Sequence, residues 1–413
     1  MNRQVMTERR ATLIGALLVA IGGMSMSLYT PAMPALVTSF ATTIPTIKLS
    51  LTLYFAGFAT AQLIVGPLSD AYGRRPAVLA FLAIYLAASL MAMVAPSVGW
   101  LLAGRLLQGI GASAGVAISR AIVRDRFTGQ RSARIMNAIG LIMAVGPALS
   151  PTIGGTILSF LGWHAIFVFM AAYGAVLMAL IAATMPETAP GRDPSHFHAL
   201  RLVRNYAAIA GDPRFLQPAI VIGCTIGTLY ASATMLPFVL IGKVGLSPVA
   251  FGIGMIAQSG SYIAGSVATR LLMRRVSAEA LVPYGILFTV AGGMLLAVLL
   301  RAAPPTYVSV MGPIGLIAFG IALVQPAATM RALAPFPHIA GSAAALLGFM
   351  QIGGGLAGGL AAAALHEPVR ALATVIPAMT LIALAVHYGL GHVNRGRADP
   401  AGSEPLEPLT PAE

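Results

Sequence analysis

Long uninterrupted apolar stretches constrain the fold of this sequence most, and residues 77–94 are one example. A helix needs about 20 mostly apolar residues to cross a hydrocarbon core of about 30 Å. Hydrophobic residues make up 58% of the chain and charged residues only 9%, whereas soluble domains carry roughly 25% charged residues. An outer-membrane barrel is disfavoured, because its strands alternate apolar and polar residues. The sequence therefore predicts an all-α polytopic membrane protein.

Hydropathy and the positions of polar residues predict twelve transmembrane helices within the 413 residues. Their ranges are near 12–36, 48–69, 77–95, 99–122, 134–160, 164–185, 215–241, 249–273, 281–300, 307–330, 340–364 and 370–390. We expect four parts: an N-terminal six-helix bundle at 1–185, a polar cytoplasmic connection at 186–214, a C-terminal six-helix bundle at 215–392 and a tail at 393–413. The tail is rich in Pro, Glu and Ala, which predicts disorder.

The formal charge of +13 follows from the topology of the chain. Of the 25 Lys and Arg residues, Arg105 lies within a predicted span and four lie in connections on one side, namely Lys48, Lys243, Arg301 and Arg370. The other 20 lie on the side of the N-terminus. Cytoplasmic loops carry such an excess of basic residues, so both termini are expected in the cytoplasm. A basic surface for nucleic acid is therefore not needed to explain the charge.

A short connection after the second predicted span combines an acid, a glycine and two arginines. The run from Gly66 to Pro76 contains Asp70, Gly73, Arg74 and Arg75. Glycine permits a tight turn, an aspartate accepts hydrogen bonds from a helix N-terminus, and arginines bridge to carbonyls or acids. We interpret the cluster as a conformational latch. Generic anchoring by positive residues on the cytoplasmic side is the simpler alternative.

The whole run resembles the loop signature of the major facilitator superfamily, and further stretches resemble its twelve-helix drug:proton antiporters of the Bcr/CflA-like subgroup. These stretches are residues 101–111 in the fourth helix, 120–125 at its exit, 146–155 in the fifth helix and 185–188 at the end of the sixth. One departure is Ala71, where the family often has a basic residue. The second half is a weaker repeat, in which Gly265 and Arg274 follow Gly66 and Arg75 by 199 residues.

The resemblance implies a major facilitator fold in a bacterial inner membrane. It also implies efflux of small amphipathic compounds such as drugs, as in antibiotic resistance, by alternating access with proton antiport. The implied partners are a drug-like small molecule, a proton as the coupling ion and the lipid bilayer, and we expect a monomer. No cofactor, metal or nucleic acid is expected, and no arrangement of catalytic residues indicates an enzyme.

Arg105 is the most informative single residue of the predicted spans, because a charged side chain inside a membrane usually faces a cavity or a partner. Gln108 lies three residues later on the same helical face. In the fifth span, Gly146, Pro147, Pro151, Gly154 and Gly155 combine missing backbone donors with close approach, which favours a deformable gate. Plain helix packing and, for Arg105, snorkelling to the interface are the alternatives.

Eight polar or aromatic residues are candidates for a mixed apolar and polar substrate cavity, as is typical of small-molecule sites. They are Ser27, Tyr29, Tyr54, Gln62, Tyr230, Gln258, Gln325 and Gln351. Each of them also fits a role in helix packing or interhelical hydrogen bonding.

No acidic residue falls in the middle of a predicted span, although proton antiport in the resembling subgroup usually relies on a first-helix aspartate. Ser27 occupies that position here, two residues before Tyr29, and a serine hydroxyl does not titrate at physiological pH. An uncoupled or differently coupled facilitator of a polar metabolite is therefore the first alternative function. A non-transporting membrane scaffold is the second.

Overall fold

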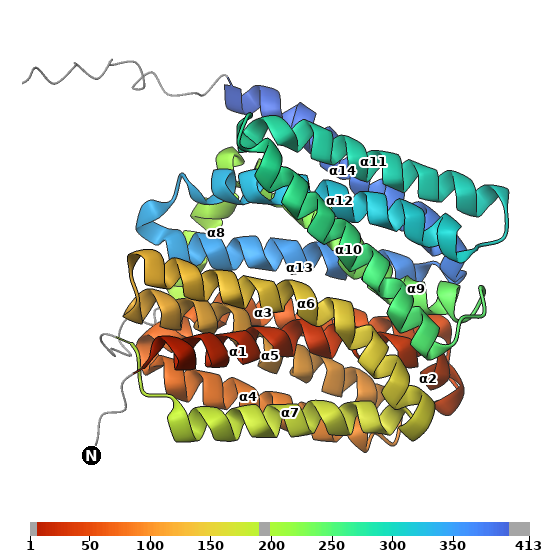
Figure 1. Ribbon diagram of the computed structural model, residues 1–413, viewed down its shortest axis with the longest axis horizontal. Coiled ribbons are helices and arrows are strands. Elements are labelled where there is room, and N and C mark those ends of the chain that lie inside the picture. The colour runs from red at the N-terminus through yellow and green to blue at the C-terminus, as the bar shows by residue number, and fades with distance from the viewer. Residues whose placement is uncertain (1–5, 190–198, 396–413) are drawn as a thin grey trace, which may run out of the picture.

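A computed structural model describes residues 6–189 and 199–395, in which all the regular elements are helices. The first seven helices and a short 3-10 turn form the lower half of Figure 1. Their bounds are α1 Glu8–Ser27, η1 Thr30–Ala32, α2 Met33–Ser39, α3 Ile44–Tyr72, α4 Arg74–Met93, α5 Val98–Arg126, α6 Gly129–Leu161 and α7 Trp163–Thr184.

The second half begins with a short helix and contains six long helices, which form the upper half of Figure 1. Their bounds are α8 Ala199–Ala210, α9 Pro213–Leu240, α10 Pro248–Leu272, α11 Ala278–Ala302, α12 Tyr307–Leu333, α13 Ala340–Ala364 and α14 Pro368–Arg395, with a 3-10 turn η3 Pro337–Ile339 before α13. All twelve expected segments are helical, so the predicted all-helical fold is confirmed.

Three features of the chain differ from the predicted boundaries. The expected span at 12–36 is divided, because α1 ends at Ser27 and a turn containing Pro31 leads into α2, where Pro34 lies in the first turn. Proline lacks the backbone N–H that a continuous helix needs. The connection expected at 186–214 contains the helix α8, and α14 continues to Arg395, three residues beyond the expected end of the second bundle. The rest of the expected tail lies outside the described residues.

Helix α8 is amphipathic and contacts the first half of the chain. The hydroxyl of Tyr206 donates a hydrogen bond to the carbonyl of Leu63 in α3 (2.6 Å). Burial raises the pKa of Tyr206 to about 12, because it disfavours the charged phenolate. Arg201 and Arg204 on the opposite face made this segment resemble a polar loop in the sequence.

Eleven stretches of the described residues are long and apolar enough to cross a membrane. The remaining long helix is α10, which is interrupted by the polar residues Gln258, Ser259 and Ser261 near its middle. Polar side chains in a spanning helix usually face the interior of the bundle. These polar residues explain why α10 is less apolar than the eleven stretches.

Buried apolar side chains form two clusters, one for each half of the chain. The first is built from α1–α7 with Phe238 of α9, and the second from α8–α14. Figure 1 shows α10 approaching α6 near α2 and running away from it toward the opposite end of the molecule. We propose residues 186–214 as the boundary between the two halves, because the core changes from one cluster to the other there.

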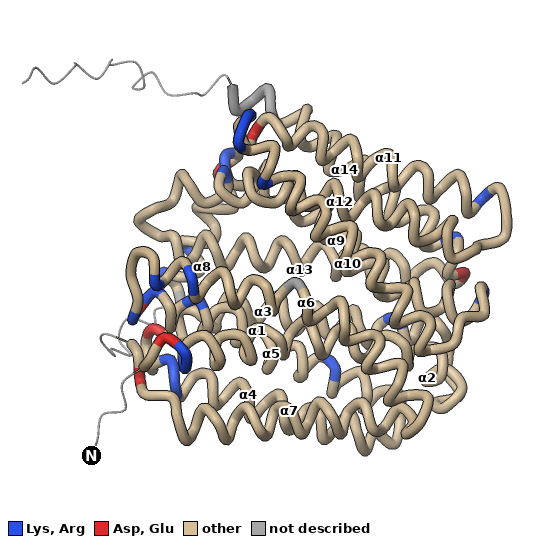
Figure 2. Tube along the Cα trace, viewed as in Figure 1, with Lys and Arg blue, Asp and Glu red and all other residues tan. Residues whose placement is uncertain are grey.

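Charged residues gather mainly at one end of the helices. Figure 2 shows most Lys, Arg, Asp and Glu near the α8 end, and few near the α2 end. We call these the basic end, where α3 ends and α4 begins, and the charge-poor end, where α3 begins and α13 ends. Alternate connections therefore differ in charge as the sequence predicts.

Two leucines of α4 that differ in burial can be changed to alanine to test how much internal packing stabilises the first half. Leu82 is buried in the first cluster and Leu90 is exposed on the same helix. We expect Leu82→Ala to lower the free energy of unfolding by about 2–5 kcal/mol, because it leaves a cavity. The matched change Leu90→Ala should cost less than about 1 kcal/mol, since lipid or detergent fills the space. Thermal unfolding of the purified variants measures both, and equal losses would contradict the packing described.

Candidate functional site

Arg74 is the centre of a charged cluster at the basic end of the first half. Its side chain is only 4% exposed and forms ion pairs with Asp70 and, through Nε, with Asp125 Oδ2 (2.9 Å). Nη1 donates to the hydroxyl of Ser69 (2.6 Å). Asp125 lies in the last turn of α5 and is 7% exposed. The cluster therefore ties the end of α3 and the start of α4 to the end of α5.

A second carboxylate, that of Glu187, occupies the N-terminus of α4. Its two oxygens accept hydrogen bonds from the backbone N–H groups of Arg74 (2.9 Å) and Arg75 (3.3 Å). Anions are favoured at this position because the first N–H groups of a helix have no partner inside it. Gly73 permits the turn with a φ of 102°. We expected Asp70 in this capping role, but Asp70 is 57% exposed and pairs with Arg74 instead.

Arg75 also participates in the predicted latch, through Nη2, which donates to the carbonyl of Ala182 in α7 (2.6 Å). The charged cluster thus joins five elements of the first half, namely α3, α4, α5, α7 and the segment after α7. Sequence reasoning selected Asp70, Gly73, Arg74 and Arg75 but not Asp125 or Glu187. The available signal was their position at helix ends, where carboxylates and backbone dipoles meet.

Arg105 is fully buried within the first half, and two aromatic rings enclose its guanidinium. The Cζ atom lies 4.4 Å from the centroid of the Tyr29 ring and 4.6 Å from that of Tyr54. Such contacts stabilise a desolvated cation by about 2 kcal/mol or more. The side chain therefore has partners inside the bundle and does not snorkel to the interface.

The polar contacts of Arg105 extend through a network of uncharged groups. Nη1 donates to the Gln108 side-chain oxygen, and Nη2 to the carbonyl of Ser25 (3.3 Å). Gln108 in turn donates to Ser89 Oγ (2.8 Å), and the hydroxyls of Ser25 and Tyr85 are 2.6 Å apart. Among the described residues, Arg105 Nε has no hydrogen-bond partner, and no carboxylate forms an ion pair with this guanidinium.

The other predicted cavity residues each have different neighbours. Tyr230 packs on Phe55 with ring centroids 5.4 Å apart, and Gln325 accepts a hydrogen bond from Tyr262. Gln62 of α3 reaches Gly348 of α13 across the two halves. Ser27 is buried at the end of α1, Gln351 is half-buried in α13, and Gln258 in α10 has a buried side-chain oxygen without a partner in the described structure. Of the eight predicted cavity residues, Tyr29 and Tyr54 are the two that contact the Arg105 guanidinium within the described residues.

At the charge-poor end, α6 contacts the second half through Gly155, the second residue of the Gly154–Gly155 pair. A Cβ added to Gly155 would overlap the carbonyl oxygen of Pro248 in α10, and one added to Gly252 would overlap the backbone of Thr152. Gly154 instead packs against the backbone of Leu28 in its own half. Such close contacts need residues without side chains.

The remaining residues of the predicted gate behave differently. Helix α6 runs unbroken past Pro147 and Pro151. Pro147 faces Gly23 of α1, where an added Cβ would lie 3.0 Å from the proline ring, whereas Gly146 faces open space. Gly146 therefore does not mediate close approach in this structure.

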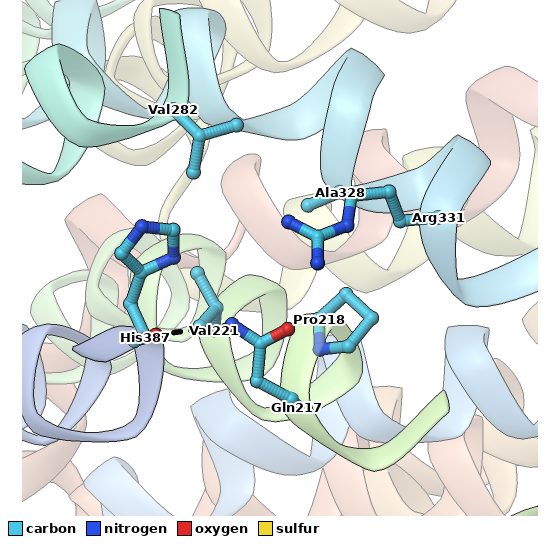
Figure 3. A pocket seen from close by; sticks show the side chains of 7 residues that line it. All are labelled: Gln217, Pro218, Val221, Val282, Ala328, Arg331 and His387. Carbon is cyan, nitrogen blue, oxygen red and sulfur yellow. Dashed lines mark hydrogen bonds between the residues drawn. The ribbon is translucent and has the colours of Figure 1, made fainter. Parts of the chain in front are cut away.

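A small cavity of about 10 Å³ lies at the basic end of the second half (Figure 3). The side chains of Gln217, Arg331 and His387 converge on it, and the Gln217 amide donates to the His387 carbonyl (3.3 Å). A cavity of this size is at the lower limit for holding one water molecule, and none of the predicted cavity residues lines it. Within the described residues, no group of three His, Cys, Asp or Glu side chains is placed to hold a metal ion.

The paired helical bundles and the charged turn between α3 and α4 define a transporter fold. The family model "Major Facilitator Superfamily" matches residues 15–362. The chain belongs to the major facilitator superfamily, a family of membrane transporters and not of enzymes, so the prediction of a non-enzymatic multi-pass membrane protein is confirmed.

Relatives cover most of the chain. An uncharacterized MFS-type transporter, YdgK, from Bacillus subtilis (strain 168) is 33% identical over 83% of this chain and 85% of that protein. Multidrug resistance protein D from Escherichia coli (strain K12) is 29% identical over 84% and 86%. The multidrug transporter MdfA from Yersinia pestis bv. Antiqua (strain Angola) is 28% identical over 78% of each chain.

Solved structures show the same fold at lower identity. The human organic anion transporter MFSD10 (TETRAN) gives a TM-score of 0.69 at 20% identity, covering 94% of this chain and 100% of that one. A bacterial homologue of the human lysosomal transporter Spinster, inward-facing and occupied, gives 0.72 at 16% identity, covering 94% and 98%. Both likenesses support the fold alone.

The geometry of this charged cluster predicts that Asp125 stabilises the fold more than Asp70 does. We expect Asp125→Asn to lower the free energy of unfolding by about 1–3 kcal/mol, because it removes a charged hydrogen bond from the buried Arg74. Asp70→Asn should cost about 0–1 kcal/mol, since that pair is open to solvent. Thermal unfolding in detergent compares the two variants. A greater loss for Asp70→Asn would contradict the assignment of Asp125 as the principal partner.

Proposed function

We propose that this major facilitator transporter exports small amphipathic compounds of the drug class by alternating access, with protons as the coupling ion. Two relatives that carry multidrug names, from Escherichia coli and Yersinia pestis, support the substrate class. The separate cores of the two halves support movement of one half against the other. We place the chain in the bacterial plasma membrane with the basic end and both termini in the cytoplasm, as the charge distribution favours.

The close contact between α6 and α10 is the observation that carries this proposal. Gly155 and Gly252 bring the two backbones together at the charge-poor end. Toward the basic end the same helices diverge, and Leu141 of α6 and Val267 of α10 are exposed. The α6–α10 contact at one end, with the same helices apart at the other, supports alternating access, because in that cycle one end parts while the other closes.

The surroundings of Arg105 favour neutral or weakly anionic substrates. A lipophilic cation entering the first half would meet a buried guanidinium, and a like charge is repelled more strongly in a low-dielectric interior than in water. The rings of Tyr29 and Tyr54 stabilise the guanidinium without neutralising its charge. A cation would therefore find no compensating carboxylate among the residues that contact Arg105.

A facilitator of a polar metabolite is the second candidate, and the position of the acids favours it. Each acidic residue in the described part of the chain lies in the first or last turn of a helix or just outside one. They are Glu8, Asp70, Asp125, Glu187, Asp212, Glu279 and Glu367. Transport by this second mode needs no carboxylate at mid-membrane depth.

Transport by the reconstituted protein discriminates these functions. In proteoliposomes with an imposed pH gradient, drug:proton antiport predicts accumulation of amphipathic compounds that collapses when an ionophore dissipates the gradient. Matched liposomes without protein provide the control. The panel should include neutral, anionic and cationic compounds of similar size. Gradient-independent equilibration of polar solutes, without accumulation of any amphipathic compound, would replace antiport with the facilitator.

Ser27→Asp tests whether charge sets the substrate preference. We expect the variant to widen recognition toward lipophilic cations, with a several-fold gain for cations and a stronger dependence on the pH gradient, because it adds a titratable group two residues before Tyr29. Ser27→Asn supplies a polar side chain of similar size without charge. Wild-type transport chiefly of lipophilic cations, unchanged in Ser27→Asp, would contradict the proposed preference.

A further inference from the structure

Lys48 is a buried cation at the charge-poor end of the interface between the two halves. It lies in the second turn of α3, and its side chain is 0% exposed. The chain has only one other lysine, Lys243, which is exposed after α9 at the same end. A buried ammonium is costly unless it is paired or hydrogen-bonded, so the partners of Lys48 indicate what the residue does.

Those partners belong to the other half of the molecule. Nζ donates to the carbonyl of Ala362 (2.9 Å) and to that of Leu365 (3.1 Å). Ala362 lies in the last turn of α13, and Leu365 is its C-cap residue. The last four carbonyls of a helix have no partner within it, and the end of the helix carries a partial negative charge. Lys48 thus caps a helix of the second half with a cation from the first.

Neighbouring groups reinforce this contact. The Glu367 carboxylate, which accepts the backbone N–H of Val369 (3.1 Å) at the start of α14, attracts the Lys48 ammonium through space. One turn after Lys48, Thr52 packs against Gly359 of α13. The contact between α3 and α13 therefore has both a charged and a close-packed component at the charge-poor end.

We infer that Lys48 is a lock that holds the two halves together at the charge-poor end, and that its bonds to α13 must break each time this end opens. The inference rests on the alternating access proposed above. Opening separates the ammonium from the carbonyls of Ala362 and Leu365 and exposes it to water. Lys48 thus positions the two halves and does not bind the substrate in this account.

A cysteine beside the lock reports whether the interface is closed. The variant Thr52→Cys in a Cys224→Ser background places a single thiol against Gly359, and a water-soluble maleimide reaches it only when α3 and α13 part. We expect Lys48→Met in this background to raise the labelling rate about tenfold, since it removes two charged hydrogen bonds. Lys243→Met, the same change at the exposed lysine, should alter the rate less than twofold. Gel filtration and thermal unfolding verify that each variant is folded.

The two native lysines give an independent measurement that does not require a Lys48 variant. In purified wild-type protein, a water-soluble acetylating reagent should modify Lys48 at least tenfold more slowly than Lys243, as read by mass spectrometry. Gly155→Leu, which places a side chain against Pro248 and wedges α6 from α10, should raise the modification of Lys48 and leave that of Lys243 unchanged.

These outcomes separate the lock from the proposed transport function, because no readout uses a substrate or a proton gradient. Folded Lys48→Met protein that labels at the wild-type rate would overturn the lock, even if the chain exports drugs. Acetylation of Lys48 as fast as Lys243 in the wild type would also overturn it. Tenfold faster labelling of Lys48→Met would support the lock, even if transport proved to be facilitated.

Discussion

The close backbone contact between α6 and α10 is the constraint on which the rest of the structure depends. Gly155 and Gly252 leave no side chains between the helices at the charge-poor end, so the two backbones pack directly against each other there. Most buried apolar side chains fall into two clusters, one for each half, with Phe238 of α9 in the first, and this supports the proposed movement of one half against the other. In the proposed transport cycle, this contact, close-packed at one end and divergent at the other, would let a small rotation of one half open one side.

Buried cations in this chain are stabilised by different means at different depths. At the basic end, Arg74 forms ion pairs with two carboxylates, where nearby water and lipid headgroups lower the cost of carrying charge. Deeper in the first half, Arg105 is held by two aromatic rings and the Gln108 side chain. At the charge-poor end, Lys48 uses the free carbonyls of a helix end. Backbone and ring dipoles thus replace acids where a carboxylate would itself be costly to bury.

Hydropathy predicted the helices well, because each must present about 20 apolar residues to lipid. The same reasoning missed α8, because a segment of this length and amphipathic pattern fits a loop as well as it fits a surface helix. The turn from Asp70 to Arg75 could be recognised as a cluster, but its capping acid could not. Glu187 is 113 residues from Arg74 and reaches it only through the packing of α7 against α4.

The substrate cavity was the least predictable part. A list of polar residues in spans does not fix the rotation of each helix, and Tyr29, Gln62 and Gln325 consequently face different neighbours. The assignment of Lys48 to a connection was wrong, because the predicted span began at that residue, whereas α3 begins four residues earlier and carries the lysine into the interface. A shift of a few residues in where a helix begins places such a residue in a loop or in the core. A hydropathy profile does not locate helix ends that finely.

Distances between paired spin labels test whether the two ends of the molecule move in opposite directions. One pair, at Leu161 and Lys243, spans the halves at the charge-poor end, and another, at Arg131 and Arg274, spans them at the basic end; all four residues are exposed. Pulsed electron paramagnetic resonance in lipid nanodiscs gives both distance distributions with and without a transported compound. The account predicts reciprocal shifts, with the first distance lengthening as the second shortens. Distances that stay fixed, or that lengthen together, would contradict it.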